Sequence, residues 1–293
     1  MDTVWKHCKG WLFRLFPHHL VSRVTFWVTR LQTPLKNPAI RMFVRAFDVD
    51  MQEARHAHPE DYASFDDFFT RQLIPGARPI APGSDVIVSP ADGRISQIAD
   101  YASHRAIQAK GRRFSMRALL GGACEYGRLC ERGKFATIYL SPRNYHRVHM
   151  PMDGVLKEMV YVPGRLFSVA PYSAEVVENL YTRNERVISI FETELGWMAV
   201  VMVGAVNVAA IELTWEGMVT PAKNRTLQRK KYSGLKLNKG DELGIFHMGS
   251  TAIVAFESLA VEWHPDLRKQ QPVKMGQLLG RSGITRPPAP EVY

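Results

Sequence analysis

Short runs of β-branched and aromatic residues, separated by glycine and proline, recur along the chain from Ile74 onward. Runs of this length are typical of strands, because helices need longer stretches with a period near 3.6. Many short strands at close spacing favour a compact, mainly β barrel or sandwich. We expect strands at residues 85–88, 94–98, 135–140, 154–162, 186–192, 197–203 and 206–215 and on both sides of Gly249, and helices only at 114–120 and 174–180.

The N-terminal part of the chain follows a helical pattern instead. From Leu20 to Leu31 the apolar residues recur at helical spacing, while Arg23 and Arg30 share the opposite side. This pattern predicts an amphipathic helix. A shorter apolar piece before it ends at Pro17, where a kink is expected.

Further helical patterns follow at residues 42–51 and 64–71, and Ser64 is placed to cap the second of them. The change to strand-like runs after this point predicts an α+β chain in two parts. We expect a basic, amphipathic, membrane-associating helical segment at 1–73 and a β-rich domain at 74–293.

Charge in the chain is concentrated at the N-terminal end. The net charge is +10, and eight lysines and arginines face a single aspartate before Asp48. A basic end suggests an anionic partner, and the interleaved aromatic residues favour a membrane surface over nucleic acid. The alternative is a surface helix that packs on its own domain. The longest uncharged run, 195–211, is shorter than the ~20 residues of a spanning helix, and no signal-peptide pattern is present. We therefore expect a peripheral membrane protein on the cytoplasmic side.

The three cysteines give no disulfide framework. Cys8, Cys124 and Cys130 are odd in number and lack a CxxC spacing. Such usage is typical of a reducing compartment, so we expect free thiols.

Three stretches of the sequence hold candidates for chemistry. Asp92 lies in a Ser-Pro-Ala-Asp-Gly turn, where an aspartate usually caps local amides. His146 and His149 lack a nearby carboxylate or cysteine to complete a metal site, so each is either a structural residue or a base, and we expect no metal. At Gly249-Ser250 a hydroxyl lies beside the preceding carbonyl, although a bulge or tight turn is the simpler interpretation. An aspartate, a histidine and a serine can together form an oriented base and an activated hydroxyl, whatever their order in the chain.

The chain resembles the bacterial type of phosphatidylserine decarboxylase proenzyme, from about Ser64 to Glu257 and more loosely in the basic N-terminal segment. Met248 departs from the leucine that this family often has there, a change that keeps volume and apolarity. The resemblance is carried by residues 64–71, 89–93, 139–151, 163–169, 184–186, 203–205 and 249–251.

This resemblance implies self-cleavage between Gly249 and Ser250, which leaves a β chain and an α chain. Ser250 would attack the preceding carbonyl, His149 would accept its proton, and Asp92 would orient His149. Ser250 would then become a pyruvoyl group, the cofactor that takes up the electrons released when CO₂ is lost. His146 would serve decarboxylation and proton transfer, a division of roles that requires an irregular backbone between the two histidines.

The substrate implied by the resemblance is phosphatidylserine in an anionic membrane, and the product is phosphatidylethanolamine. Phe167 and Ser168 are candidate substrate contacts, unless residues 163–169 form only a turn between strands. The resemblance also allows a homodimer of αβ units. Two alternatives stay open: a decarboxylase of the same family that acts on another amino-acid substrate, and a lipid-binding module that never matures.

Overall fold

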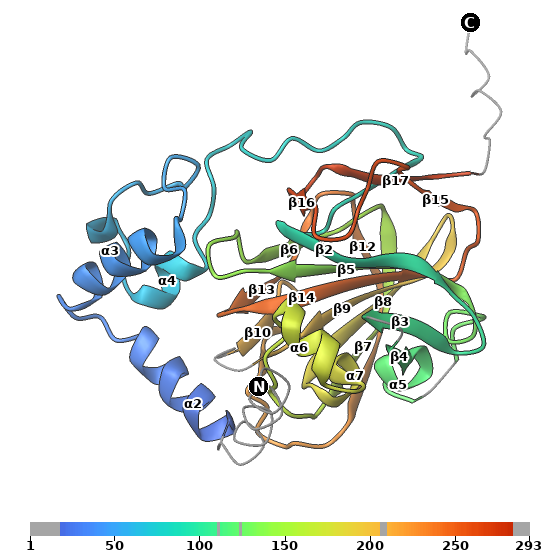
Figure 1. Cartoon of the computed structure of the whole chain (residues 1–293), viewed down its shortest axis with the longest axis horizontal. Coiled ribbons are helices and arrows are strands. Elements are labelled where there is room, and N and C mark those ends of the chain that lie inside the picture. Colours follow the sequence, from blue (N-terminus) through green and yellow to red (C-terminus); the bar gives the residue numbers. More distant parts are fainter. Residues whose placement is uncertain (1–17, 110–111, 123–124, 206–209, 284–293) are drawn as a thin grey trace, which may run out of the picture.

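An open eight-stranded antiparallel sheet forms the centre of the molecule (Figure 1). The computed structural model describes residues 18–109, 112–122, 125–205 and 210–283. Strands β12 and β16 form the two edges of the sheet, so it does not close into a barrel. In spatial order its strands are β12 (Gln228–Leu237), β7 (Gly154–Val162), β8 (Arg186–Thr193), β9 (Gly196–Val203), β14 (Ser250–Phe256), β5 (Gly133–Leu140), β2 (Gly93–Tyr101) and β16 (Pro272–Val273).

Strand β14 lies in the middle of this sheet, paired with β5 on one side and β9 on the other. All seven of its residues are buried. Because successive side chains point to opposite faces, Val254 and Phe256 enter one hydrophobic cluster while Ile253 and Ala255 enter another. The sheet is therefore covered on both faces, which explains why β14 is almost entirely apolar.

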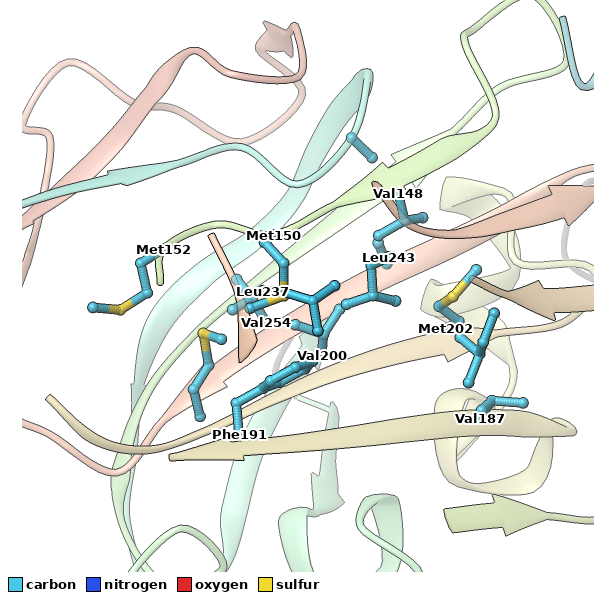
Figure 2. Close-up of a cluster of buried hydrophobic side chains, with 14 of the residues drawn as sticks. Val148, Met150, Met152, Val187, Phe191, Val200, Met202, Leu237, Leu243 and Val254 are labelled. Atoms are coloured by element: carbon cyan, nitrogen blue, oxygen red, sulfur yellow. The ribbon is translucent and has the colours of Figure 1, made fainter. Parts of the chain in front are cut away.

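A second, four-stranded sheet covers one face. Its order is β11 (Gly217–Thr220), β10 (Ala210–Leu213), β13 (Glu242–His247) and β6 (Arg147–His149). Figure 2 shows the resulting core, in which Val148 and Leu243 from the smaller sheet approach Val200 and Val254 from the larger one. This part of the fold is a two-sheet sandwich.

Short helices and a hairpin cover the other face. These elements are β3 (Arg105–Ala109), β4 (Arg112–Ser115), α5 (Met116–Leu119), α6 (Pro171–Val176) and α7 (Leu180–Arg183). The buried side chain of Arg186 joins two of the helices to the sheet, because its guanidinium donates to the carbonyls of Ala118, Leu119, Thr182 and Asn184. A three-stranded sheet of β1 (Val86–Val88), β15 (Val261–Trp263) and β17 (Leu278–Ser282) completes the strand-rich part.

The N-terminal helices lie together at one side of the strands (Figure 1). They are α2 (His18–Thr29), α3 (Lys36–Phe47), the 3₁₀ turn η1 (Pro59–Asp61) and α4 (Phe65–Phe69). As expected, Ser64 caps α4 by accepting a hydrogen bond from the Asp67 amide at 3.1 Å. Ile40, Phe68 and Phe69 form a small core of their own. Within the described residues, no helix combines the length and apolarity needed to cross a bilayer.

The α+β class and most of the expected strands are confirmed, but three expectations are wrong. The helix expected at 174–180 is broken at Asn179, which adopts a positive φ of 52° between α6 and α7. Phe114, expected at the start of a helix, belongs to β4. Cys130 is disulfide-bonded, so it is not a free thiol, whereas Cys8 and Cys124 lie outside the described residues. The expected kink at Pro17, part of the strand at 206–215 and most of the C-terminal tail also lie outside the described residues.

Candidate active site

The Met248–Gly249 turn joins the smaller sheet to the larger one. Strand β13 ends at His247 and β14 begins at Ser250. Both residues of the turn have positive φ, 83° at Met248 and 27° at Gly249. A methionine rarely adopts this region because its Cβ crowds the backbone, so the turn is strained immediately before Ser250.

Ser250 lies at the wall of a cavity of about 210 Å³. Its hydroxyl is fully buried and has no hydrogen-bond partner among the described residues. An unpartnered buried hydroxyl is unusual in a folded protein and leaves the oxygen free to react. The other lining residues come from the N-terminal helices, from β5 and from four connecting segments: Phe43, Phe47, Phe69, Tyr139, Leu140, Pro142, Ser168, Val169, Ala170, Ala205, Met248 and Gly249.

His146 packs against the same aromatic wall. Its ring centroid lies 4.1 Å from that of Phe69, and the residue is completely buried. Nδ1 lies 2.7 Å from the Asn144 carbonyl and therefore donates to it, whereas Nε2 has no partner among the described residues. Burial, together with the nearby charge of Arg71, lowers the pKa of His146 to about 3. The ring is thus a neutral imidazole with an unpaired Nε2.

The backbone is irregular at His146, as the division of roles between the two histidines requires. Tyr145 and His146 precede β6, and only Arg147 to His149 pair as a strand. Within the described residues, no three potential metal ligands cluster, here or elsewhere.

Both ring nitrogens of His149 already have partners. Nδ1 lies 2.8 Å from the Gly240 carbonyl and Nε2 lies 3.0 Å from the Tyr145 hydroxyl. Burial lowers the pKa of His149, and the Gly240 carbonyl and the carboxylates of Glu242 and Asp92 act in the opposite direction. The neutral ring donates from Nδ1 to the carbonyl and accepts from the tyrosine at Nε2.

Asp92 is held by a different set of partners. Arg78 binds both carboxylate oxygens, at 2.8 and 2.6 Å, and the Met275 amide donates to one of them at 2.8 Å. Asp92 therefore influences His149 through its charge. The hydrogen bonds of the described residues do not join the side chains of Asp92, His149 and Ser250 to one another.

Of the two candidate substrate contacts, Ser168 lines the cavity, whereas Phe167 is buried and is not among the lining residues. The Arg183 guanidinium covers the ring of Phe167, 4.8 Å from its centroid. Asn184 fixes the 163–169 loop: its side chain accepts from the Phe167 amide at 3.1 Å and donates to the Phe167 and Gly204 carbonyls at 2.8 Å each. Asn184 thus shapes one side of the cavity.

Sequence reasoning assigned no role to four residues around this site: Arg78, Tyr145, Asn184 and His247. Arg78 lies in a proline-rich segment whose apolar residues follow neither helical nor strand periodicity. The sequence therefore does not indicate whether its side chain faces the core or the solvent. Tyr145 and Asn184 fall within stretches that carry the resemblance, so their position there is a signal that could have found them.

Comparison with known protein families matches this chain to one family. The family model described as phosphatidylserine decarboxylase matches residues 65–281, and a model described as PSD matches residues 8–48.

Individual proteins named phosphatidylserine decarboxylase proenzyme align over nearly their whole length. The protein of Saccharophagus degradans is 47% identical over 273 residues, covering 92% of this chain and 95% of the relative. That of Bordetella avium is 49% identical over 269 residues, covering 90% and 91%, and that of Nitrosococcus oceani is 43% identical over 295 residues, covering 96% and 94%. The chain belongs to the phosphatidylserine decarboxylase family.

Proposed function

We propose that this chain is a proenzyme that cleaves itself between Gly249 and Ser250 and then converts phosphatidylserine to phosphatidylethanolamine. The observation that carries the proposal is the buried, unpartnered hydroxyl of Ser250, next to a strained turn and at the wall of a cavity. The proenzyme names of the relatives support the same reaction.

Self-cleavage needs only the chain itself and water. Ser250 Oγ bonds to the Gly249 carbonyl carbon and the peptide bond breaks, which leaves an ester and a free serine amine. The Cα proton of Ser250 then leaves, its Cβ–Oγ bond breaks, and Gly249 departs as a carboxylate, so that a Cα=Cβ double bond forms. A proton adds to Cβ, which becomes a methyl group, and a Cα=N bond forms. Water then supplies the carbonyl oxygen at Cα, the nitrogen leaves as ammonia, and the pyruvoyl group remains.

His149 is the proposed base for the serine proton. Because Nε2 is bonded to Tyr145 in the described arrangement, that bond must be exchanged before Nε2 can take the proton of Ser250. Asp92 assists by its charge, since a carboxylate near the ring favours the imidazolium that forms. Arg78 fixes the position of that carboxylate.

The proposed cofactor site fits a pyruvoyl group, because the freed end of β14 faces the cavity and lacks a competing hydrogen bond. When formed, this group supplies the electron-accepting carbonyl that amino-acid decarboxylation needs and that ordinary side chains lack. His146 packs against Phe69, which lines the cavity, and the unpaired Nε2 of its neutral ring is the proposed acceptor in proton transfer during turnover. Phe167 and Ser168 remain the proposed substrate contacts.

Membrane association fits the arrangement of the helical segment. Phe43 and Phe47 of α3 line the cavity, so a lipid head group would enter between this segment and the strands. We assign residues 1–73 to membrane association and 74–293 to catalysis, with the protein bound peripherally on the cytoplasmic side. After cleavage β14 stays paired with β5 and β9, which would keep the α and β chains together as one αβ unit, alone or in a homodimer.

The test begins on a denaturing gel. Wild-type protein should run as a large and a small chain, and the small chain should have a blocked N-terminus. Ser250→Ala should run as one band near 33.2 kDa, whereas the matched control Ser258→Ala should be cut normally. His149→Ala and Asp92→Asn should block cutting, and His146→Ala should permit cutting but abolish turnover.

Turnover is measured as release of CO₂ from phosphatidylserine in mixed detergent micelles. An uncut wild-type chain would favour the lipid-binding module. A cut chain that releases no CO₂ from phosphatidylserine would favour another amino-acid substrate. If His146→Ala is fully active, its proposed role is wrong.

A further inference from the structure

A buried charged cluster lies two residues before the proposed cleavage site. Nε2 of His247 lies 3.0 Å from the Glu212 carboxylate, and Nδ1 lies 3.0 and 3.1 Å from the two oxygens of Asp66. The Arg30 guanidinium approaches the same place, 3.0 Å from Asp66 and 2.9 Å from Nδ1. The side chains of His247 and Asp66 are only 7% and 9% exposed. These four residues are called the His247 cluster below.

The cluster joins segments that are far apart in the sequence. Arg30 directly follows α2, Asp66 belongs to α4, Glu212 to β10, and His247 is the last residue of β13. Its bonds therefore connect the end of α2, and α4, to the strand that enters the Met248–Gly249 turn. A surface ion pair would contribute little, but the central pair of His247 and Asp66 is largely withdrawn from water, while Arg30 and Glu212 are 26% and 35% exposed.

The location of the cluster suggests what it does. A turn with a non-glycine residue at positive φ relaxes unless the structure holds it from both ends. The Ser250 end is held inside the larger sheet, where β14 pairs with two neighbours. At the other end the side chain of His247 is bound to the helices and to β10.

We propose that His247 is a positioning residue for self-cleavage, which holds the Met248–Gly249 turn in its strained form and ties it to the end of α2 through Asp66 and Arg30. The inference rests on the proposed cleavage at Gly249–Ser250. The proposal makes cleavage depend on the docking of the N-terminal helices, because a chain whose α2 and α4 are not in place lacks two partners of His247.

The test measures the rate of cleavage in freshly synthesised full-length chain, by following the two products on a denaturing gel in detergent without lipid. His247→Ala should cleave at least about tenfold more slowly, since it leaves Asp66 and Glu212 without their shared partner. His247→Lys should restore most of the rate, because a lysine offers donors to both carboxylates. Arg30→Ala should slow cleavage by about threefold, and this effect should vanish when His247 is already alanine.

Two controls match these variants. Arg23→Ala removes the same kind of side chain from the exposed part of α2. His264→Gln removes a histidine that faces Asp266 at 3.8 Å, away from the turn. Both should cleave at the wild-type rate.

Folding is checked separately by adding Ser250→Ala to each variant and measuring thermal unfolding of the uncut chains. Slow cleavage by a variant that unfolds at the same temperature supports a positioning role. If His247→Ala does not fold, the cleavage rates of Arg30→Ala and Glu212→Gln are measured in its place. Cleavage at the wild-type rate by both of these variants overturns the proposal. Normal cleavage by a folded His247→Ala overturns it as well. An uncut wild-type chain would instead refute the proposed function.

Discussion

His146 is neutral in this fold because its surroundings oppose a positive charge on the ring. Burial is the larger cause and Arg71 the second, and together they lower the pKa from 6.5 to about 3. In the unfolded chain the ring would protonate first as the pH falls, so folding stability is intact above about pH 6.5 and is lost progressively between 6.5 and 3. The group proposed for proton transfer therefore also makes the protein sensitive to acid.

Removing the charge of Arg71 should raise the pKa of His146. Arg71→Gln leaves the ring buried, so the pKa should rise but stay below 6.5. The measurement is an NMR titration of the ring carbons of His146 in the Ser250→Ala chain, which remains a single species. Arg71→Lys keeps the charge and should leave the titration close to that of the parent chain. Equal curves for Arg71→Gln and the parent would show that Arg71 has no electrostatic effect on His146.

At the scale of single residues, the sequence identified candidate reactive residues but not their hydrogen-bond partners. Ser250 was singled out by the resemblance, because Gly249 and Ser250 alone are equally typical of a bulge or tight turn. The Arg78 bond to Asp92 could not be predicted, because it joins two turns whose meeting depends on the whole sheet. For the same reason the sequence did not reveal that His149 is already bonded to Tyr145 and Gly240.

At the scale of elements, the 163–169 loop is held in part by one buried side chain. Asn184 lies just after α7 and is fully buried, and its three side-chain hydrogen bonds fix Phe167 and Gly204. An amide suits this place because it donates and accepts at once. The loop therefore has a defined shape beside Ser250, although it contains no helix or long strand.

Asn184→Asp should loosen this loop. The substitution removes two donors and places a carboxylate against two carbonyls, a change that costs about 1–3 kcal/mol for each unpaired buried group. We expect a lower unfolding temperature and a higher KM for phosphatidylserine, with self-cleavage less affected. The matched control is Asn179→Asp at an exposed position five residues earlier. Unchanged KM and unfolding temperature in Asn184→Asp would contradict the role given to Asn184.

The prediction of strands and helices succeeded where burial decides the order of apolar and polar residues, and it failed where burial does not decide that order. Strand β7 was expected at 154–162 and is found there, because its position inside the sheet selects β-branched and other apolar residues on both sides of Lys157 and Glu158. Strand β12 was missed: it forms an edge, and its sequence of lysine, arginine and glycine protects that edge from pairing with another chain. The break at Asn179 depends on a single positive φ that the helical pattern conceals.

At the scale of the whole molecule, composition and spacing predicted an α+β chain but not how its layers assemble. The order β12-β7-β8-β9-β14-β5-β2-β16 joins strands from both ends of the chain, and such long-range pairing leaves no periodic trace in the sequence. The placement of β14 at the centre explains the site. A strand buried on both faces can hold Ser250 rigidly while the turn before it is strained.

Helix α2 turns its apolar side outward, the reverse of a helix that packs on its own domain. Leu20, Val24, Trp27 and Val28 are 62%, 54%, 73% and 58% exposed, whereas Arg30 points toward Asp66. Aromatic and aliphatic side chains on such a face suit the boundary between lipid head groups and acyl chains. The whole molecule would then sit with the cavity lined by Phe43 and Phe47 near the lipid surface.

Replacing Trp27 by serine should weaken binding to the membrane without affecting maturation. Burial of a large apolar side chain is worth about 1.5–3 kcal/mol, so Trp27→Ser should reduce binding by about tenfold or more. The measurement is co-sedimentation with vesicles of phosphatidylserine and phosphatidylcholine, alongside the cleavage gel. Leu259→Ser is the matched control, since Leu259 is 52% exposed but lies between β14 and β15, away from α2. Equal loss of binding in both variants would indicate non-specific adhesion, and normal binding by Trp27→Ser would show that α2 does not face the membrane.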